Sequence, residues 1–341
     1  MRLVFLSVVI ALSLAATKDN HWAVIVAGSD GFWNYRHQAD TCHAYHIMKQ
    51  NGIPEDHIIH FAKDDVASHS RNPFPGKLFN KPNGKDVYEG CNIDYKGGDV
   101  TPEKFLSVLR GEEQPNGGKT LKTTKGDKIF INFSDHGSPG LIAFPSKPLY
   151  ASDFIETLKF MHEQEMYAEM VIYIEACESG SMFENLLPDN INIYATTAAN
   201  SVESSWGYYC YPDDIVDGKH IGSCLGDLYS IVWMEDADAA KICTETIGEQ
   251  FTTIKTKTTK SHVMEFGDLS IKPEVIGNFQ GSCDSPSIQN KLYSLFNTAI
   301  NVVADTFTKT EYTAWDSRDV KLHYLYNRYI ETKDPIDAME L

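Results

Sequence analysis

The stretch Glu169-Met-Val-Ile-Tyr-Ile-Glu-Ala-Cys-Glu-Ser-Gly180 decides the expected fold. Residues 170–174 form a short apolar run rich in β-branched and aromatic side chains, which is typical of a strand buried on both faces. The run gives way to a small, polar segment that holds Cys177 and ends in Gly180. Ligands bind outside the carboxyl ends of strands in open α/β sheets. Cys177 is therefore either a buried structural thiol, as free cysteines often are, or part of a site.

Other apolar runs predict further strands of the same sheet, at residues 21–27, 58–61, 128–134, 192–197 and 262–266. Helical patterns separate them, at residues 40–51, 101–110, 152–167, 225–234 and 239–255. Alternating strands and helices predict an α/β fold with a mostly parallel central sheet flanked by helices. Beyond Gly281 the composition shifts, and we expect a short helical C-terminal tail there.

Composition narrows the possible functions of the 341-residue chain. It carries 47 acidic and 30 Lys or Arg residues, a formal net charge of −17, so nucleic acid is not an expected partner. Residues 1–16 have a basic start and a short apolar core, which predicts a secretory signal peptide. We expect no membrane span in the mature protein. The turn at Gly28-Ser-Asp-Gly31 lacks the spacing of a dinucleotide fingerprint, and we expect no cofactor.

Three predicted strand ends bring reactive groups to one edge of the sheet. Parallel strands ending near residues 27, 134 and 176 would place Asn34, His136 and Cys177 together. A nearby imidazole lowers the pKa of a thiol and generates the nucleophilic thiolate. The backbone N–H groups of Gly137 and Cys177 could stabilise a tetrahedral oxyanion. The order of the residues, histidine first and Glu-Ala-Cys-Glu-Ser-Gly around the cysteine, partly matches the caspase signature.

The chain resembles the legumains, the asparaginyl endopeptidase family of caspase-like cysteine proteases, over roughly residues 22–281. The matching stretches are Val24-Ile-Val-Ala-Gly28, Asn34-Tyr-Arg-His-Gln-Ala-Asp40, Asn51-Gly-Ile-Pro54, Asp99-Val-Thr-Pro102, Asp135-His-Gly-Ser138, Tyr173-Ile-Glu-Ala-Cys-Glu-Ser-Gly-Ser-Met182, Tyr194-Ala-Thr-Thr-Ala-Ala-Asn200 and Leu225-Gly-Asp-Leu-Tyr-Ser230. The resemblance implies a caspase-like fold with residues 17–281 as the peptidase domain. It implies a catalytic pair of His136 and Cys177, with Asn34 supporting the histidine.

The resemblance also implies a pocket that selects asparagine. Its residues would be Arg36, Glu175 and Asp227, with His37 and Ser204 or Ser205 nearby. A carboxamide has an acceptor oxygen and a nitrogen with two donor hydrogens. Arg36 would supply donors, and the two carboxylates would supply acceptors. Each of these charged residues could instead belong to an ordinary salt bridge. Protonated aspartate has a similar shape, so weak cleavage after aspartate at acid pH is a secondary expectation.

The seven cysteines are an odd number, so at least one is free or paired between chains, and Cys177 is the candidate. The resemblance implies a disulfide between Cys210 and Cys224. The pairing among the four others, Cys42, Cys91, Cys243 and Cys283, is left open. Asp135 is a family feature associated with a succinimide and is a candidate accessory residue.

A metal site at Cys42, His43 and His46 is a competing hypothesis, because the two histidines lie three residues apart on one predicted helix. Structural zinc usually has four ligands at recognisable spacing, and no second pair of ligands is evident. We therefore expect no metal.

The sequence departs from the family pattern at its C-terminal end. Residues 282–341 are predicted to be a helical extension, and the helical prodomain of family zymogens is expected to be absent. Ser317-Arg-Asp-Val320 and the helical pattern to Glu331 resemble the segment upstream of the usual activation peptide.

The main hypothesis is a monomeric cysteine endopeptidase that cleaves after asparagine, in a lysosome- or vacuole-like compartment or secreted. Its partners would be peptides and proteins with exposed asparagine, and cystatin-type inhibitors. The alternatives are a peptide ligase using the same site, a GPI-transamidase-like subunit, and an inactive binding homologue. The intact set of Cys177, His136 and Asn34 argues against inactivity.

Overall fold

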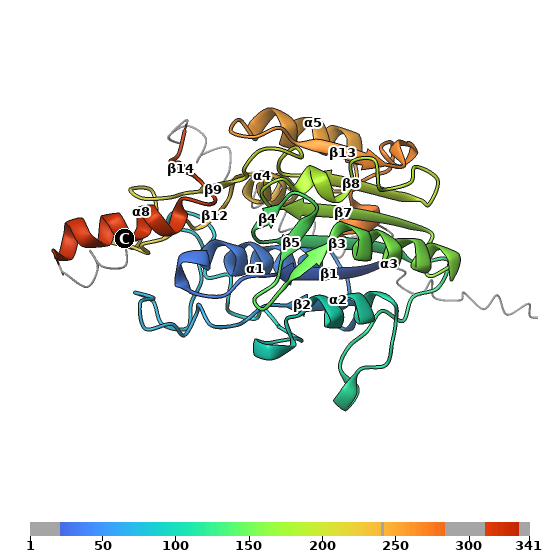
Figure 1. The fold of residues 1–341 in the computed structure, drawn as a ribbon, viewed down its shortest axis with the longest axis horizontal. Coiled ribbons are helices and arrows are strands. Elements are labelled where there is room, and N and C mark those ends of the chain that lie inside the picture. Colours follow the sequence, from blue (N-terminus) through green and yellow to red (C-terminus); the bar gives the residue numbers. More distant parts are fainter. Residues whose placement is uncertain (1–20, 240–241, 284–310, 334–341) are drawn as a thin grey trace, which may run out of the picture.

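The computed structural model describes residues 21–239, 242–283 and 311–333. A six-stranded sheet in the order β13-β8-β7-β3-β1-β2 forms its centre (Figure 1). The strands are β1 (His21–Ala27), β2 (Ile58–Phe61), β3 (Lys128–Ser134), β7 (Glu169–Glu175), β8 (Ile193–Thr197) and β13 (Met264–Gly267). All neighbours pair in parallel except β13, which runs antiparallel to β8. The predicted mostly parallel sheet is therefore confirmed.

The order of the strands creates a switch point between β1 and β3. The chain pairs β2 with one edge of β1 and then returns to pair β3 with the other edge. The connections therefore leave β1 and β3 in opposite directions, which opens a crevice at their carboxyl ends. The predicted site residues Asn34 and His136 follow these two strands.

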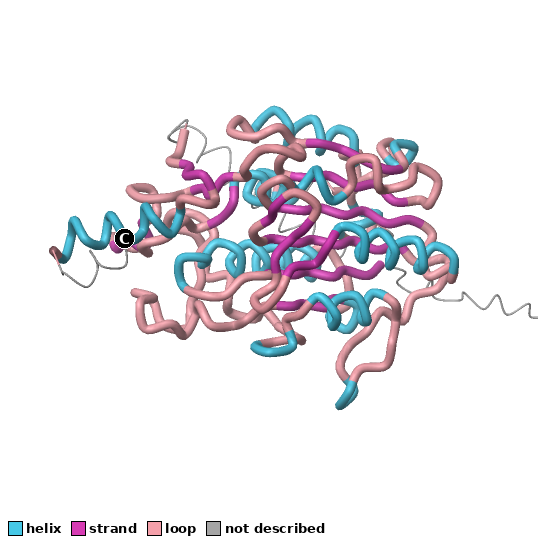
Figure 2. Tube along the Cα trace, viewed as in Figure 1, coloured by secondary structure: helices cyan, strands magenta, loops and turns pink. Residues whose placement is uncertain are grey.

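Helices cover both faces of the sheet (Figure 2). Ala23 and Ile25 of β1 belong to a core shared with α1 (Tyr35–Gln50), α4 (Leu228–Asp238) and α5 (Ile247–Lys257). Val24 and Val26 belong to a second core with α2 (Pro102–Leu109) and α3 (Ala151–Glu163). Alternate residues of a strand point to opposite faces, so an unbroken apolar run fits a strand covered on both sides.

Several predicted helix boundaries were wrong, among them those of the helix predicted at residues 225–234, which spans Leu228–Asp238. The helix predicted from residue 40 begins at Tyr35, which places Arg36, His37 and Asp40 on its first turns. The helix predicted to reach residue 167 ends at Glu163. The helix predicted from residue 239 begins at Ile247, because Thr246 and Glu249 form a reciprocal capping box there. The short helix α6 (Gly277–Gln280) follows β13.

Three small sheets surround the carboxyl edge of the central sheet. They contain β4 (Gly137–Ser138), β5 (Leu141–Ala143) and β6 (Pro148–Tyr150); β9 (Trp206–Tyr208), β12 (Gly226–Asp227) and β14 (Ala314–Asp316); and β10 (Ile215–Val216) with β11 (Lys219–His220). β14 pairs antiparallel with β9, so this C-terminal strand forms one edge of the small sheet that also contains β12.

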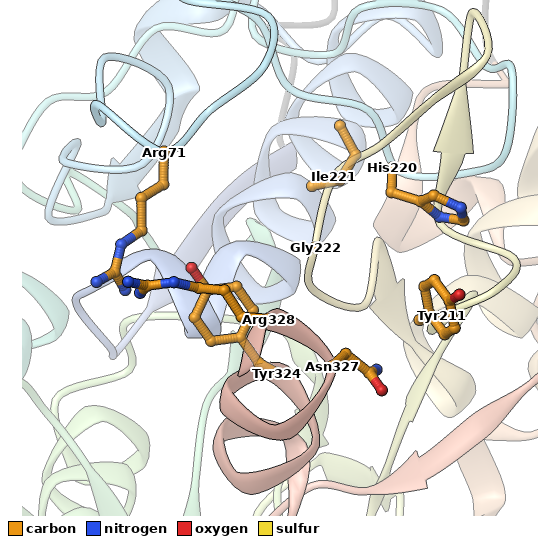
Figure 3. Close-up of a pocket in the computed structure, with 8 residues that line it drawn as sticks. All are labelled: Arg71, Tyr211, His220, Ile221, Gly222, Tyr324, Asn327 and Arg328. Carbon is orange, nitrogen blue, oxygen red and sulfur yellow. The ribbon is translucent and has the colours of Figure 1, made fainter. Parts of the chain in front are cut away.

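The predicted C-terminal helix is present as α8 (Val320–Thr332). It borders a hollow of about 360 Å³ beside the loop at residues 211–222 (Figure 3). The hollow is lined by Arg71, Tyr211, His220, Ile221, Gly222, Tyr324, Asn327 and Arg328. None of the residues predicted for the site lines it. Among the described residues, the helices are too short or too polar to cross a lipid bilayer.

The cysteine pairing that the sequence left open is resolved. Disulfides join Cys42 to Cys91, Cys210 to Cys224, and Cys243 to Cys283. Cys177 is the free thiol, and it is buried. The predicted signal peptide lies outside the described residues, as does most of the extension that begins at residue 282.

Candidate active site

The register of the central sheet brings the backbone after β3, which carries His136, next to the backbone after β7, which carries Cys177. Ser134 at the end of β3 pairs with Glu175 at the end of β7, and each predicted site residue follows its strand end by two positions. Gly137 lies against this junction, since a Cβ atom at that position would be 2.1 Å from the carbonyl oxygen of Cys177. Only glycine allows the backbone after His136 to approach the backbone of Cys177 so closely.

Asn34 fixes the orientation of the His136 ring. The Asn34 side-chain Nδ2 donates to the carbonyl oxygen of Asp30 at 2.8 Å, so its Oδ1 faces His136 Nε2 at 2.9 Å. That oxygen can only accept, which requires Nε2 to carry a hydrogen. In the neutral ring, Nδ1 is then the free base. Burial, followed by the charges of Arg36 and Arg318, lowers the pKa of His136 to about 3.

The Cys177 thiol is held by Ser205. The Ser205 N–H donates to Sγ at 3.4 Å, and its hydroxyl oxygen lies 3.7 Å from Sγ. Burial raises the pKa of Cys177, while the Ser205 contacts and the charge of Arg318 oppose the rise. Thiol and imidazole are therefore both neutral at rest. Glu178, the next residue, has a φ of 46°, a left-handed conformation that is unusual outside glycine.

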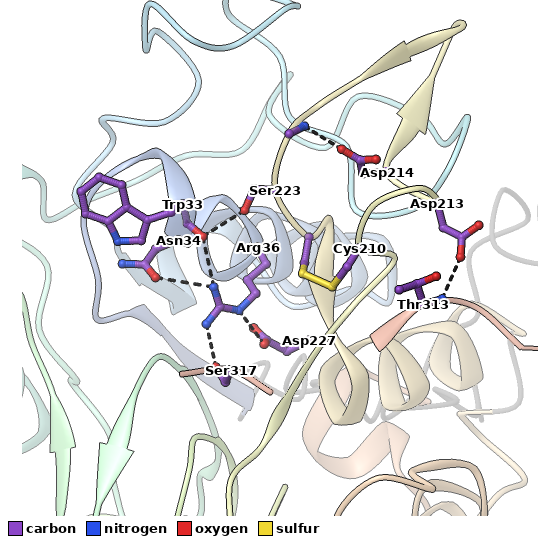
Figure 4. The surroundings of a disulfide bond; sticks show 12 residues. Trp33, Asn34, Arg36, Cys210, Asp213, Asp214, Ser223, Asp227, Thr313 and Ser317 are labelled. Atoms are coloured by element: carbon purple, nitrogen blue, oxygen red, sulfur yellow. Dashed lines mark hydrogen bonds and ion pairs between the residues drawn. A yellow bond between two sulfur atoms is a disulfide. The ribbon is translucent and has the colours of Figure 1, made fainter. Parts of the chain in front are cut away.

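Arg36 is fully buried and its guanidinium is fixed on several sides (Figure 4). Nε donates to Asp227 Oδ1 at 2.8 Å, and Nη2 donates to Ser317 Oγ at 2.7 Å. Nη1 donates to the carbonyl oxygen of Trp33 at 3.2 Å and to Asn34 Oδ1 at 3.5 Å. These bonds use four of the five guanidinium N–H groups. The fifth has no hydrogen-bond acceptor among the described residues.

Two buried carboxylates beside Arg36 keep one oxygen each without a hydrogen-bond partner among the described residues: Glu175 Oε1 and Asp227 Oδ2. The other Glu175 oxygen, Oε2, accepts from the backbone N–H and the hydroxyl of Ser230 at 3.0 and 3.1 Å. His37 Nε2 lies 3.5 Å from Asp227 Oδ2. When both carboxyl groups are ionised, the arrangement offers one donor and two acceptors.

The other predicted residues occupy different places around the site. Ser205 contacts the thiol, whereas Ser204 accepts from Arg318 Nη1 at 2.9 Å. Asp135 is buried, with Oδ1 3.4 Å from His37 Nδ1. One ligand atom from each of His37, Asp135 and His136 lies within 4.8 Å of the others, and His37 Nδ1 also lies 2.6 Å from Ser29 Oγ.

The competing metal hypothesis does not fit the structure. Cys42 is bonded to Cys91, so its sulfur is not available as a thiolate. His43 contacts Asn80 and Asp238, and His46 Nε2 contacts the carbonyl oxygen of Val87 at 3.0 Å. The three residues therefore have separate partners.

Two residues of the site, Ser317 and Arg318, lie in the C-terminal segment and were not predicted. Pairing of β14 with β9 brings Ser317 and Arg318 next to the site. The Ser317 N–H donates to the carbonyl oxygen of Ser205 at 3.0 Å. Arg318 forms an ion pair with Glu178. Their stretch resembles a family segment, and that similarity is the sequence signal that points to them.

Replacing Arg318 with alanine should raise the pH at which Cys177 becomes reactive. Arg318 lowers the pKa of the thiol through its charge, so its loss disfavours the thiolate. We expect the rate of alkylation by iodoacetamide at pH 7 to fall by about two- to fivefold, as for a partly exposed charge. Because the variant also changes access, the pH midpoint of the rate is the measurement. Arg110→Ala is the control, and an unchanged midpoint would contradict the assignment.

The buried acids predict that stability falls above neutral pH. Burial is the main cause that raises the pKa of Asp40, Asp135 and Glu175 well above ordinary values. Such a carboxyl binds a proton more tightly when folded. It contributes stability that is present below its unfolded pKa of about 4 and is lost as the pH rises through its folded pKa.

The buried histidines act in the opposite direction. Burial lowers the pKa of His37 well below its ordinary value. It also lowers the pKa of His60 to about 4 and the pKa of His136 to about 3. Their contribution is present above the unfolded pKa of about 6.5 and is lost as the pH falls. We expect a plateau in the urea midpoint between about pH 4 and 6.5, with a decline above it that Glu175→Gln makes shallower. A midpoint that rises from pH 6.5 to 8 would refute this.

Known proteins are similar to the chain in sequence. Residues 21–282 match the Peptidase C13 family. Hemoglobinase of Schistosoma mansoni is 45% identical over 319 residues, which cover 94% of this chain and 70% of that protein. Legumain of Mus musculus is 51% identical over 265 residues, 76% of this chain and 59% of that protein. The crystal structure of caspase-1 from Spodoptera frugiperda has a TM-score of 0.47 at 10% identity, covering 77% of this chain and 92% of that one.

Proposed function

The chain belongs to the peptidase C13 family of cysteine endopeptidases, and from this we propose that it hydrolyses peptide bonds on the carboxyl side of asparagine. One observation carries the specificity: a buried arginine with one remaining N–H lies beside two carboxylate oxygens without partners among the described residues. Buried polar groups are costly when they are unpaired, so this set favours a ligand that pairs all three.

In the proposed reaction, Cys177 Sγ attacks the carbonyl carbon that follows the asparagine Cα. The thiol proton passes to His136 Nδ1, because Nε2 is engaged with Asn34. The N–H groups of Gly137 and Cys177 donate to the oxyanion. The C–N bond then breaks, and His136 returns the proton to the leaving amine. Water then attacks the thioester carbonyl and gives a proton to His136. The C–S bond breaks, the acid leaves, and His136 returns that proton to the Cys177 sulfur.

The pocket assigns one partner to each atom of the substrate carboxamide. The free Arg36 N–H donates to the amide oxygen, and Glu175 Oε1 and Asp227 Oδ2 accept from the amide nitrogen. Glutamine has the same group on a side chain one methylene longer, so it cannot make all three contacts at the same backbone position. Aspartate fits when protonated, which predicts weak cleavage at acid pH.

The test is cleavage of the fluorogenic peptides Ala-Ala-Asn, Ala-Ala-Gln and Ala-Ala-Asp at pH 5 and pH 7. We expect the asparagine peptide to be cleaved at least about 100-fold faster than the glutamine peptide, because a buried site rejects a ligand that leaves its polar groups unpaired. Equal rates for the two would overturn the pocket assignment. No cleavage of any peptide by the wild-type protein would overturn the proposed reaction.

The proposal extends to the setting of the enzyme. Three disulfides favour a protein of the secretory pathway, in an acidic lysosome- or vacuole-like compartment or outside the cell. The expected partners are peptides and proteins with exposed asparagine and cystatin-type inhibitors, and the expected state is a monomer. Size-exclusion chromatography with light scattering tests the last point.

A further inference from the structure

His43 faces hydrogen-bond acceptors with both ring nitrogens. Nε2 lies 3.1 Å from the Asp238 carboxylate, and Nδ1 lies 2.7 Å from the side-chain oxygen of Asn80. The Asn80 amide is oriented by its Nδ2, which donates to two oxygens, so its Oδ1 must be the atom that faces the ring. A ring that donates from both nitrogens is an imidazolium. His43 lies on α1, two turns after Arg36.

Asn80 connects this imidazolium to the segment that carries Asp227. Its Nδ2 donates to Asp40 Oδ1 at 2.7 Å and to the carbonyl oxygen of Leu225 at 3.0 Å. Gly226 makes the approach possible, since a Cβ atom there would lie 2.8 Å from Asn80 Nδ2. Asn80 is 3% exposed, so water has little access to these bonds.

Asp40 completes the connection. Its Oδ2 accepts from the backbone N–H of Asp227 at 3.2 Å, and the hydroxyl of Ser134 lies 3.5 Å from the same oxygen. Asn80 and Asp40 thus hold the backbone on both sides of Gly226, at the carbonyl of Leu225 and at the N–H of Asp227. The chain of contacts runs from Asp238, whose side chain is 38% exposed, to the fully buried Asp227.

We propose that Asp40, held by His43 through Asn80, is a positioning residue that fixes Asp227 and thereby the acceptor side of the asparagine pocket. This inference rests on the proposed asparagine specificity. The backbone N–H of Asp227 is fixed by Asp40, and its side chain is fixed by Arg36. Loss of the first contact leaves the carboxylate held by Arg36 at Oδ1 and by the 3.5 Å contact of His37 Nε2 with Oδ2, so the position of Oδ2 becomes less fixed.

The charges around His43 are consistent with the doubly donating ring. Burial lowers its pKa, but the charge of Asp238 and the hydrogen bonds to Asp238 and Asn80 outweigh that effect, and the net shift is upward. Lys81 opposes the shift, and Lys85 and His46 are the other charged or titratable groups on neighbouring segments. The proton on His43 keeps the Asn80 amide from flipping, because a flipped amide would place its NH₂ group against Nδ1–H.

We call the connection from His43 through Asn80 to Asp40 the relay. The variants Asn80→Ala and His43→Gln test it, and neither changes a residue that touches substrate. His46→Gln is the matched control, since His46 lies three residues further along α1 and also contacts one acceptor, the carbonyl oxygen of Val87. We expect Asn80→Ala to raise KM for Ala-Ala-Asn about tenfold and His43→Gln about threefold, with kcat changed less than about twofold. His46→Gln should leave both constants within about twofold.

A second measurement does not depend on activity. NMR titration of ¹⁵N-histidine-labelled protein should show a resonance, absent from His43→Gln, that titrates above the ordinary histidine range and moves to lower pH in Asn80→Ala. If Asn80→Ala lowers stability, this NMR titration still tests the relay, and His43→Gln supplies the kinetic comparison.

If the wild-type protein cleaves after asparagine and KM is unchanged in both Asn80→Ala and His43→Gln, the relay is overturned but the proposed function is not. A loss of kcat with unchanged KM would also overturn it, because the effect would then lie on the chemistry rather than on the pocket. A His43 resonance that titrates at or below the ordinary range would do the same. Absence of wild-type cleavage would overturn the proposed function, and the relay's effect on specificity with it.

Discussion

Replacing Cys177 with alanine should reduce cleavage of the asparagine peptide by at least about 10⁴-fold. The thiol is the only proposed nucleophile, and removal of a nucleophile leaves only the residual rate from binding and oxyanion stabilisation. The disulfides account for the other six cysteines, so none of those is a free thiol that could take its place. The measurement is kcat/KM at pH 5.

Two comparisons separate chemistry from folding in this experiment. Cys177→Ser retains a polar atom near the Ser205 N–H and should be as inactive as the alanine variant, because a hydroxyl is a far weaker acid than a thiol. The thermal midpoints of both variants should stay within about 4–5 °C of wild type, since removal of one buried sulfur costs roughly 1 kcal/mol. Cleavage by Cys177→Ala at more than a tenth of the wild-type rate would refute the role of the thiol.

Replacing Arg36 with methionine should lower kcat/KM for the asparagine peptide by roughly 10³-fold and destabilise the fold. The guanidinium neutralises Asp227 and donates to Ser317 and the Trp33 carbonyl oxygen. Without it, buried carboxylates lose their cation, a change that typically costs about 3–5 kcal/mol. The cost should shrink below neutral pH, because the carboxyls can then be protonated.

Arg36→Lys tests the geometry of the Arg36 guanidinium group separately from its positive charge. An ammonium supplies the charge but cannot reach Asp227, Ser317 and Trp33 together, so we expect much of the stability to return and most of the activity to remain lost. Urea unfolding at pH 5 and pH 7 gives the stability, and the Asn and Gln peptides give the specificity. A lysine variant with wild-type activity would show that charge alone suffices. Arg110→Lys serves as the surface control.

The sequence was most informative where the physical constraint is local. A strand covered on both faces must be apolar throughout, so β1, β2 and β3 could be placed to the residue. A helix boundary depends on contacts outside the helix, and the start of α1 at Tyr35 was missed. That start matters for the site, because it places Arg36 and Asp40 on the buried first turns.

Candidate residues could be named from strand ends and from the family resemblance, but their contacts could not. Asp40 lay within a quoted family stretch, yet nothing in a linear sequence indicates that its carboxylate accepts from the N–H of a residue 187 positions away. Ser317 and Arg318 were placed in an extension that was expected to be a separate tail. Pairing of β14 with β9 brings them to Arg36 and Glu178.

The sequence by itself therefore determined the α/β sheet and the family, together with a short set of candidate reactive residues. Tertiary structure decided which cysteines pair, which nitrogen of His136 is free, and which oxygens of Glu175 and Asp227 lack partners among the described residues. The reason is physical. Burial patterns repeat every two or four residues and can be recognised locally, whereas a hydrogen bond depends on two atoms meeting within about 3 Å, which the packing of the whole chain sets.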